Sequence, residues 1–322
     1  MRAIQVQSFG GPEVLEVVQV DAPRPGPGQV LVDVAATGVN YIDTYHRSGT
    51  YNVPLPLVPG SEGAGTVSAV GEGVKELRVG DRVGWVAAPQ SYAEQVVVNE
   101  AAAIPVPAGI SDEVAAAVLL QGLTAHYLCT STYAIQPGDT ALVHAAAGGV
   151  GLLLTQMVKM RGGTVIATVS TDEKAKLARG AGADEVIRYD QVEFAPEVRR
   201  LTDGVGVAVV YDGVGKDTFD ASLASLRPRG MMALYGGSSG QVPPFDPQRL
   251  NGAGALFLTR PSLGYYAATR EELLGRAQDV FGWIQDGRLD VRIGGRYSLD
   301  DARSAHADLQ SRRTTGKLLL LR

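Results

Sequence analysis

The sequence VHAAAGGVG, residues 143–151, decides the fold that we expect. It follows an apolar run typical of a buried strand and precedes a stretch that favours helix. Aligned on the dinucleotide-binding pattern G-x-G-x-x-G, its key positions are Ala146, Gly148 and Gly151, so alanine replaces the first glycine. Gly148 would let the backbone approach a pyrophosphate, and Gly151 would let the helix pack on the strand. A tight turn without a ligand is the alternative, but the strand–loop–helix context favours a nucleotide site.

Strands and helices alternate on both sides of this loop, from about residue 139 to 260. The strand candidates are 140–144, 164–169, 185–187, 207–211, 231–235 and 255–258, and the helix candidates are 150–161, 173–179, 192–201 and 219–226. This alternation predicts a doubly wound parallel sheet, hence an α/β protein. The first ~100 residues read instead as short strands between Gly and Pro, which suggests a barrel or bent sheet. A helix follows with Asp112 as its expected N-cap, and a closing strand, 317–321, could return to the first domain.

The composition is that of a soluble globular protein. The chain has 322 residues, of which 45% are apolar and 20% charged, and its net charge is −5. This charge gives no pull toward nucleic acid or anionic membranes, although a local basic patch stays open. The single cysteine, Cys129, forms no internal disulfide and excludes a zinc site of several thiolates. We see no signal peptide and no apolar run near the ~18 residues that span a bilayer, and we expect a cytoplasmic protein.

The end of the second strand, 164–169, indicates which nucleotide binds. An NAD site normally has Asp or Glu there, whereas Ser170 and Thr171 come first here, followed by Asp172, Glu173 and Lys174. Small hydroxyls leave room for a 2′-phosphate that Lys174 could neutralise, which favours NADPH over NADH. The two acids are then explained as the N-cap and first turn of the next helix.

Blocks of sequence along nearly the whole chain resemble the zeta-crystallin-type quinone oxidoreductases of the medium-chain dehydrogenase/reductase superfamily. They include NYIDTYHRSGTY (40–51), PGSEGAGTVSAVGEGV (59–74), QGLTAHYL (121–128), HAAAGGVG (144–151) and LTRPSL (258–263). The resemblance implies a GroES-like catalytic domain made of residues 1–121 and 265–322, with a Rossmann domain, 122–264, between them. It also implies NADPH bound in an interdomain cleft and a homodimer paired through the last Rossmann strand, near 254–259.

The family's cofactor contacts transfer to matching positions of this chain. The glycine loop supplies Gly148, Gly149, Val150 and Gly151; the 2′-phosphate site takes Ser170, Lys174 and Tyr189; the nicotinamide side takes Val214, Gly236, Gly237, Ser238, Ser239, Leu258, Thr259 and Arg260; the remaining contacts are Asn40, Tyr41, Tyr45, Thr124, Tyr127 and Arg312. Two alternatives stay open. Tyr189 could simply cover the sheet edge, and residues 236–239 could form a plain loop that binds no ligand. Asn40 and Tyr45 are candidate catalytic residues, because they could hydrogen-bond a quinone oxygen or the nicotinamide ribose.

A zinc site is not expected. Alcohol dehydrogenases of the superfamily carry Gly-His-Glu where this chain has Gly60-Ser61-Glu62, and the four histidines are scattered. A quinone is already electron-poor, so it needs positioning more than a Lewis acid. We therefore expect a zinc-independent NADPH:quinone oxidoreductase. The resembling family often reduces quinones by one electron to semiquinones, and the sequence leaves one- and two-electron transfer open. The alternatives are an NADPH-dependent reductase of activated double bonds in enals or enones, a non-catalytic NADPH-binding protein, and an RNA-binding protein.

Overall fold

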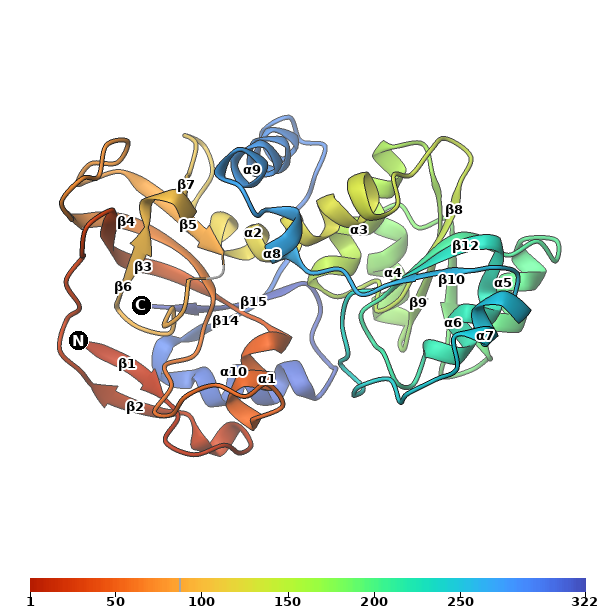
Figure 1. Ribbon diagram of the computed structural model, residues 1–322, viewed down its shortest axis with the longest axis horizontal. Helices are drawn as coiled ribbons and strands as arrows, with labels where there is room; N and C mark the ends of the chain where they lie inside the picture. The colour runs from red at the N-terminus through yellow and green to blue at the C-terminus, as the bar shows by residue number, and fades with distance from the viewer. Residues whose placement is uncertain (87) are drawn as a thin grey trace. The chain divides into compact units, whose positions relative to one another are not determined.

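The structure is a computed structural model that describes residues 1–86 and 88–322 (Figure 1). These residues divide into two compact units. The first, which we call the split unit, consists of Met1–Gln121 and Ala267–Arg322 and contains both chain ends. The second, the inserted unit, consists of Gly122–Tyr266.

A six-stranded parallel sheet forms the centre of the inserted unit, with strand order β10-β9-β8-β11-β12-β13. Its strands are β8 (Thr140–Val143), β9 (Thr164–Val169), β10 (Glu185–Arg188), β11 (Val207–Asp212), β12 (Leu226–Leu234) and β13 (Phe257–Thr259). In chain order this is 3-2-1-4-5-6, so the predicted doubly wound sheet is confirmed. Every residue of β11 is buried, because a central parallel strand is covered on both faces.

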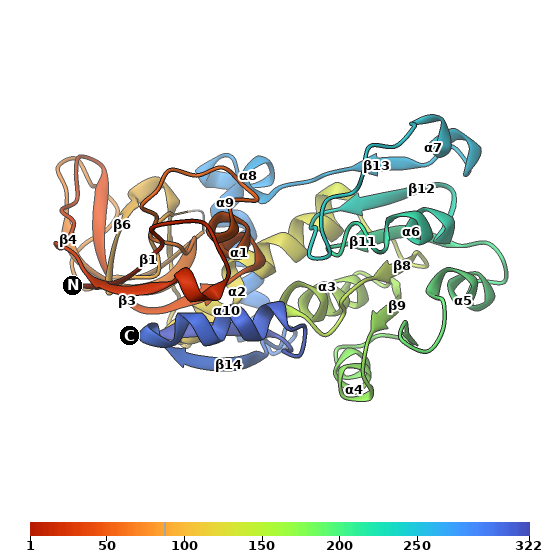
Figure 2. The same ribbon diagram turned by 90° about the horizontal axis from the view of Figure 1, so that it is seen from below.

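Helices cover the two faces of this sheet (Figures 1 and 2). They are α3 (Gly149–Met160), α4 (Asp172–Gly180), α5 (Phe194–Leu201), α6 (Phe219–Ser225) and α7 (Gln248–Gly252), and a short helix that does not cover the sheet, α8 (Leu263–Tyr266), ends the unit. α3 packs on β8 and β9, while α5 and α6 pack together on the other face. Phe194 and Phe219 bring these two helices into one core with Leu142 and Val210 of the sheet.

The split unit is built mainly from strands. In the part of the chain that the structure describes, seven strands form one sheet, in the order β14-β15-β3-β4-β5-β7 with β6 paired to β3, and β1 and β2 form a separate pair. The strands are β1 (Arg2–Gln5), β2 (Glu16–Gln19), β3 (Gln29–Val39), β4 (Glu62–Val70), β5 (Arg82–Val86), β6 (Gln95–Asn99), β7 (Ala103–Pro105), β14 (Ile293–Ser298) and β15 (Lys317–Leu321). The predicted closing strand, β15, pairs antiparallel with β3, so the two ends of the chain complete one sheet.

Helices of the split unit are α1 (Tyr41–Ser48), α9 (Arg270–Gln285) and α10 (Ala302–Gln310). A further helix, α2 (Asp112–Tyr127), continues into a π-helical segment, Leu128–Thr132. The prediction that Asp112 caps this helix is wrong. Ser111 accepts the Val114 amide at 3.2 Å, as an N-cap does, whereas the Asp112 carboxylate pairs with Arg82 at 2.6 Å.

One expectation about apolar runs is also wrong. The helical stretch Asp112–Thr132 has 21 residues and is apolar enough to cross a membrane by length and composition. However, 72% of its apolar window is buried inside the protein, as in the core helix of a soluble protein. Gln121, Thr124 and His126 interrupt the apolar residues of this stretch, so it does not read as a continuous apolar run in the sequence.

Candidate cofactor-binding site

The glycine loop joins β8 to α3, and one position at the start of α3, Gly151, has room only for glycine. Ala145 has a left-handed φ of +48°, and Gly148 is the extended N-cap of α3. A Cβ on Gly151 would lie 2.4 Å from the Ala145 carbonyl oxygen and 2.6 Å from the Ala146 Cα. Because both are backbone atoms, a side chain at Gly151 would force α3 away from the loop.

The start of α3 provides amides for an anion. Leu152 donates to the Gly148 carbonyl at 3.0 Å. The amides of Gly149, Val150 and Gly151 come before it, where a helix offers its N–H groups no intrahelical acceptor. The partial positive charge of this 12-residue helix is concentrated at the same end. The geometry suits a phosphate group.

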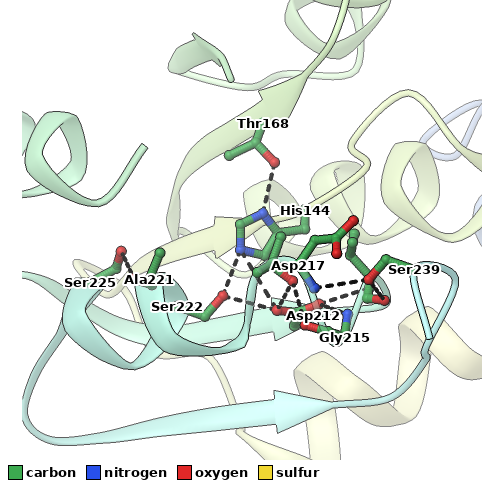
Figure 3. Close-up of polar contacts among 11 residues, drawn as sticks. His144, Thr168, Asp212, Gly215, Asp217, Ala221, Ser222, Ser225 and Ser239 are labelled. Atoms are coloured by element: carbon green, nitrogen blue, oxygen red, sulfur yellow. Dashed lines mark hydrogen bonds and ion pairs between the residues drawn. The ribbon is translucent and has the colours of Figure 1, made fainter. Parts of the chain in front are cut away.

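A buried hydrogen-bond chain begins at His144, the residue that follows β8 (Figure 3). His144 Nδ1 is 2.8 Å from Thr168 Oγ1, its Nε2 is 2.9 Å from Ser222 Oγ, and Ser222 Oγ donates to Asp212 Oδ2 at 2.9 Å. The serine proton is directed at the carboxylate, so His144 Nε2–H must donate to the serine oxygen and Thr168 must donate to Nδ1. Burial lowers the pKa of His144 and favours this neutral form.

Asp212 ends this chain as a carboxylate surrounded by donors. Its Oδ1 accepts the amides of Val214 at 2.7 Å and Gly215 at 2.9 Å, and its Oδ2 accepts the Thr218 hydroxyl at 2.7 Å besides that of Ser222. The serine stands between histidine and aspartate, which is not the order of a nucleophilic triad. These hydrogen bonds instead connect the ends of β8, β9 and β11 with α6, and they hold the loops that follow these strands.

The loop after β11 is joined to the loop after β12. Ser239 Oγ accepts the Asp217 amide at 3.0 Å and donates to the Val214 carbonyl at 2.8 Å (Figure 3). A Cβ on Gly236 would lie 2.5 Å from the Gly213 carbonyl oxygen, so glycine allows the two loops to approach. The predicted segment 236–239 therefore lies at the carboxyl edge of the parallel sheet, where open α/β sheets bind ligands.

The tip of β9 presents a serine and a lysine together. Lys174 Nζ lies 3.5 Å from Ser170 Oγ. Thr171, not Asp172, is the N-cap of α4, since its hydroxyl accepts the Lys174 amide at 3.2 Å. Asp172 and Glu173 occupy the first helical turn, so the N-cap part of that prediction is wrong and the first-turn part is right. Tyr189 follows the neighbouring strand and is 47% exposed.

The remaining predicted contacts of the inserted unit lie on α2 and near β13. Tyr127 is buried and stacks on Tyr266 with ring centroids 4.4 Å apart. Thr124 lies one helical turn before it. Leu258 and Thr259 belong to β13, and Arg260 follows this strand.

Asn40 of the split unit lies at the centre of a buried polar cluster. Its Oδ1 accepts Lys317 Nζ at 2.7 Å and also Gln121 Nε2. Its Nδ2 donates to Glu62 Oε1 at 2.8 Å and to the Gly38 carbonyl at 3.2 Å. All four hydrogen-bonding positions of this amide are engaged, so a ligand contact would have to replace one of these bonds.

The same cluster buries an ion pair. Lys317 donates to Glu62 Oε1, while Glu62 Oε2 accepts the Leu120 amide at 2.8 Å. Side-chain exposure is 3% for Lys317 and 0% for Glu62. Burial lowers the pKa of Lys317, and the attraction of Glu62 opposes this change.

A second hydrogen-bond chain connects α10 to the start of α1. Arg47 Nη1 donates to His306 Nδ1 at 3.0 Å, so the ring proton is on Nε2, which is 3.0 Å from the Tyr92 hydroxyl. The Tyr92 hydroxyl donates to Asp43 Oδ2 at 3.0 Å, and the backbone N–H of Asn40 donates to the same oxygen at 2.9 Å. Burial raises the pKa of Asp43 to about 7 and lowers that of His306 to about 3.

Three other predicted residues belong to the split unit. Tyr41 and Tyr45 lie on α1 with ring centroids 6.4 Å apart, and the Tyr41 hydroxyl donates to the Leu309 carbonyl at 3.1 Å. Arg312 follows α10 in a turn, with a left-handed φ of +59°.

The donor set of the split unit does not fit a zinc ion. Ser61 presents a buried hydroxyl that has no hydrogen-bond partner among the described residues, and Glu62 is already bound by an ammonium group. Within residues 1–86 and 88–322, no group of three or more His, Cys, Asp or Glu side chains is placed to hold a metal ion. Zinc prefers thiolate and imidazole ligands, which this cluster lacks.

Sequence reasoning missed Glu62, Lys317 and Asp212 as organising residues. One signal was present, since Lys317 begins an otherwise apolar strand and a lysine there needs a partner when buried. Asp212 ends an apolar strand in the same way. Neither partner could be identified, because Glu62 and Lys317 are 255 residues apart.

Comparisons with known proteins agree with this architecture. Residues 26–137 match the family model described as alcohol dehydrogenase GroES-like domain, and residues 149–273 match that of zinc-binding dehydrogenase. The chain is 47% identical to a quinone oxidoreductase of Pseudomonas aeruginosa, with 99% of each chain covered. It is 40% identical to a 2-haloacrylate reductase of a Burkholderia species, covering 99% of this chain and 98% of the relative.

Two solved structures are similar over the whole chain. A mycobacterial protein complexed with NADPH is 53% identical, with a TM-score of 0.98 and all of both chains covered. The Escherichia coli quinone oxidoreductase complexed with NADPH is 43% identical, again with a TM-score of 0.98 and full coverage of both. The chain therefore belongs to the quinone oxidoreductase family of the medium-chain dehydrogenase/reductase superfamily.

Proposed function

We propose that this protein is an NADPH-dependent quinone oxidoreductase. The observation that carries the proposal is the β8–loop–α3 arrangement, in which Gly151 lets the helix end approach the loop and leaves its first amides for a pyrophosphate. Bound NADPH supplies the reducing equivalents. The chain's own residues bind it, orient it and keep the loops beneath it fixed through Asp212 and His144.

We assign the phosphate contacts to the inserted unit. Gly148 and the amides of Gly149, Val150 and Gly151 hold the pyrophosphate, while Ser170, Lys174 and Tyr189 hold the adenosine 2′-phosphate. The segments 236–239 and 258–260, with Val214, line the nicotinamide side. The other assigned contacts are Asn40, Tyr41, Tyr45, Thr124, Tyr127 and Arg312. Because all hydrogen-bonding positions of the Asn40 side chain are engaged, its cofactor contact would replace one of its present bonds, and we leave a direct substrate hydrogen bond to Tyr45.

Calorimetric titration tests the cofactor assignment. NADPH should bind the purified protein more tightly than NADH, and Lys174→Ala should weaken NADPH binding much more than NADH binding, because only NADPH has a 2′-phosphate. Lys176→Ala, on the exposed side of the same helix, is the matched control and should leave the ratio unchanged. No binding heat with either nucleotide would refute the proposal.

We further propose that reduction of the quinone proceeds without zinc. A hydroxyl at Ser61 and the Lys317–Glu62 ion pair support this, since neither suits the metal. Metal analysis of active protein should find far less than one zinc per chain, and chelator treatment should leave activity intact. Stoichiometric zinc in active protein would contradict this part of the proposal.

A second candidate substrate class is an activated carbon–carbon double bond. The similarity to a 2-haloacrylate reductase favours keeping it. Anaerobic stopped-flow measurement of NADPH oxidation with a quinone and with an enone separates the two, and faster oxidation by the enone would reverse our choice. Tight NADPH binding with no turnover across a quinone panel would instead identify a non-catalytic binding protein.

We also propose one-electron delivery to the quinone, as the family resemblance implies. One NADPH would then reduce two quinone molecules by one electron each. Electron paramagnetic resonance during anaerobic turnover should detect the one-electron-reduced quinone at levels above those produced by mixing oxidised and fully reduced quinone. Its absence above that background would favour two-electron transfer.

The exposed edge of the parallel sheet supports a homodimer. β13 is the last strand of the sheet, and Phe257 on it is 58% exposed. Unpaired strand edges with apolar side chains need cover. Sedimentation should show a dimer, and Phe257→Lys should shift it toward monomer. A wild-type monomer at micromolar concentration would exclude this assembly.

A further inference from the structure

Arg188 binds two carboxylates at the tip of the sheet. Its Nε and Nη2 donate to the two oxygens of Asp190 at 2.8 and 2.7 Å, and its Nη1 donates to Asp172. The Arg188 side chain is 17% exposed, whereas that of Asp172 is 87% exposed. The bidentate contact with Asp190 holds the shielded guanidinium of Arg188 in one orientation. The exposed carboxylate of Asp172 is therefore held toward Arg188 at the end of β10.

This ion pair lies beside the proposed 2′-phosphate contacts. Arg188 is the last residue of β10 and is paired in register with Val169, the last residue of β9. Ser170 follows Val169 directly, and Asp172 opens the helix that carries Lys174. Asp172 is therefore the acid closest in sequence to the strand end where NAD sites place a carboxylate for the ribose hydroxyls.

An unpaired carboxylate at that place would act against a phosphorylated ribose. It would repel the 2′-phosphate over a short distance, and it would offer the acceptor that an unphosphorylated ribose needs. Arg188 opposes both effects, because it neutralises Asp172 and holds its oxygens toward β10. Asp190 keeps the guanidinium in position through its bidentate contact.

We propose that Arg188 determines cofactor specificity by restraining Asp172, so that a strand end followed by two acidic residues still selects NADPH over NADH. The inference rests on the proposed function, since it concerns the nucleotide that the site prefers. It makes Arg188 a positioning residue and assigns it no contact with the cofactor.

A double-mutant cycle tests this role. Arg188→Met should raise the dissociation constant of NADPH by about 3- to 10-fold and leave that of NADH unchanged or lower, because Asp172 becomes free to repel the phosphate. Asp172→Asn alone should change neither constant by more than about 2-fold. The double variant Arg188→Met/Asp172→Asn should return NADPH binding to within about 2-fold of wild type. The loss in Arg188→Met should also shrink in 0.5 M salt.

The cycle has a matched control and distinct failures. Arg200 forms an exposed ion pair with Glu197 on α5 of the same unit, and Arg200→Met should leave the NADPH to NADH ratio unchanged. If Asp172→Asn fails to rescue Arg188→Met, then Arg188 does not act through Asp172 and the inference is wrong. An unchanged ratio in Arg188→Met would also overturn it. A wild-type protein that binds neither nucleotide would instead refute the proposed function.

Discussion

Asp212 of the inserted unit and Glu62 of the split unit are both completely buried carboxylates, but their charges are balanced differently. Asp212 accepts two backbone amides and two hydroxyls, all neutral, and a neutral histidine extends the chain. Glu62 is balanced by the ammonium group of Lys317, which is buried with it. Neutral donors spread the carboxylate charge over several elements, whereas an ion pair concentrates the compensation in one side chain.

The comparison explains what each cluster does for its unit. The Asp212 cluster holds the loops at the carboxyl edge of the parallel sheet, and many short bonds fix them without a mobile charge. The Glu62 cluster connects β4 and β15 to the start of α1, and removal of the Lys317 ammonium group would leave Glu62 buried without a counter-ion. The split unit is therefore the more sensitive of the two to a single substitution.

The largest expected effect follows from removing that cation. Lys317→Met should lower the free energy of unfolding by about 3–5 kcal/mol, because Glu62 would be left buried without its counter-ion. Urea denaturation followed by circular dichroism measures this loss. Adding Glu62→Gln should recover part of it. If the free energy of unfolding of Lys317→Met lay within about 1 kcal/mol of wild type, the ion pair would not stabilise this unit.

Asp43, beside this cluster, should give the split unit a pH-dependent stability. Its pKa rises from 3.8 to about 7 on folding, so the folded state holds the proton more tightly. The stabilisation is complete below the ordinary pKa and is lost as the pH rises through about 7. As the pH rises from 4 to 8, the free energy of unfolding of Asp43→Asn should therefore increase relative to that of wild type by on the order of a few kcal/mol. Urea titrations across this range measure the gain, and parallel curves would contradict the shift.

In the neutral cluster a single deletion should cost less. Ser222→Ala removes the acceptor of His144 and one donor to Asp212, for a loss of about 1–3 kcal/mol. Ser225→Ala is the control on the same helix, since the one hydrogen bond that its hydroxyl makes among the described residues goes to the Ala221 carbonyl at 2.8 Å (Figure 3). It should lose less stability than Ser222→Ala in thermal unfolding. Equal losses would mean that the Asp212 chain has no special weight.

The smallest effect is expected at the far end of the same chain. Thr168→Val keeps the side-chain shape and removes only the donor to His144 Nδ1, at a cost of about 1 kcal/mol. The imidazole and the carboxylate keep their other bonds. A loss as large as that of Lys317→Met would show that the neutral cluster is no more tolerant than the ion pair.

Prediction from sequence worked best where the structure depends on neighbouring residues. Both ends of the predicted strand 164–169 agree with the structure, and the strand before the glycine loop ends one residue earlier than predicted. These predictions worked because continuous apolar runs between turns are local signals. The cap of α2 was misplaced by one residue, from Ser111 to Asp112. Both residue types favour that position, and only the partner of Asp112, Arg82, decides between them.

By itself, the sequence determined the order of strands and helices, the glycine loop and the hydroxyl tip of β9, since each depends on residues close together in the chain. Only the tertiary structure decided the environments of Asn40, Asp43 and Asp212. Asn40 contacts Lys317 across 277 residues, and His144 contacts Ser222 across 78. Partners at such separations are brought together by the packing of whole strands and helices, and it is burial with these partners that sets their hydrogen bonds and charges.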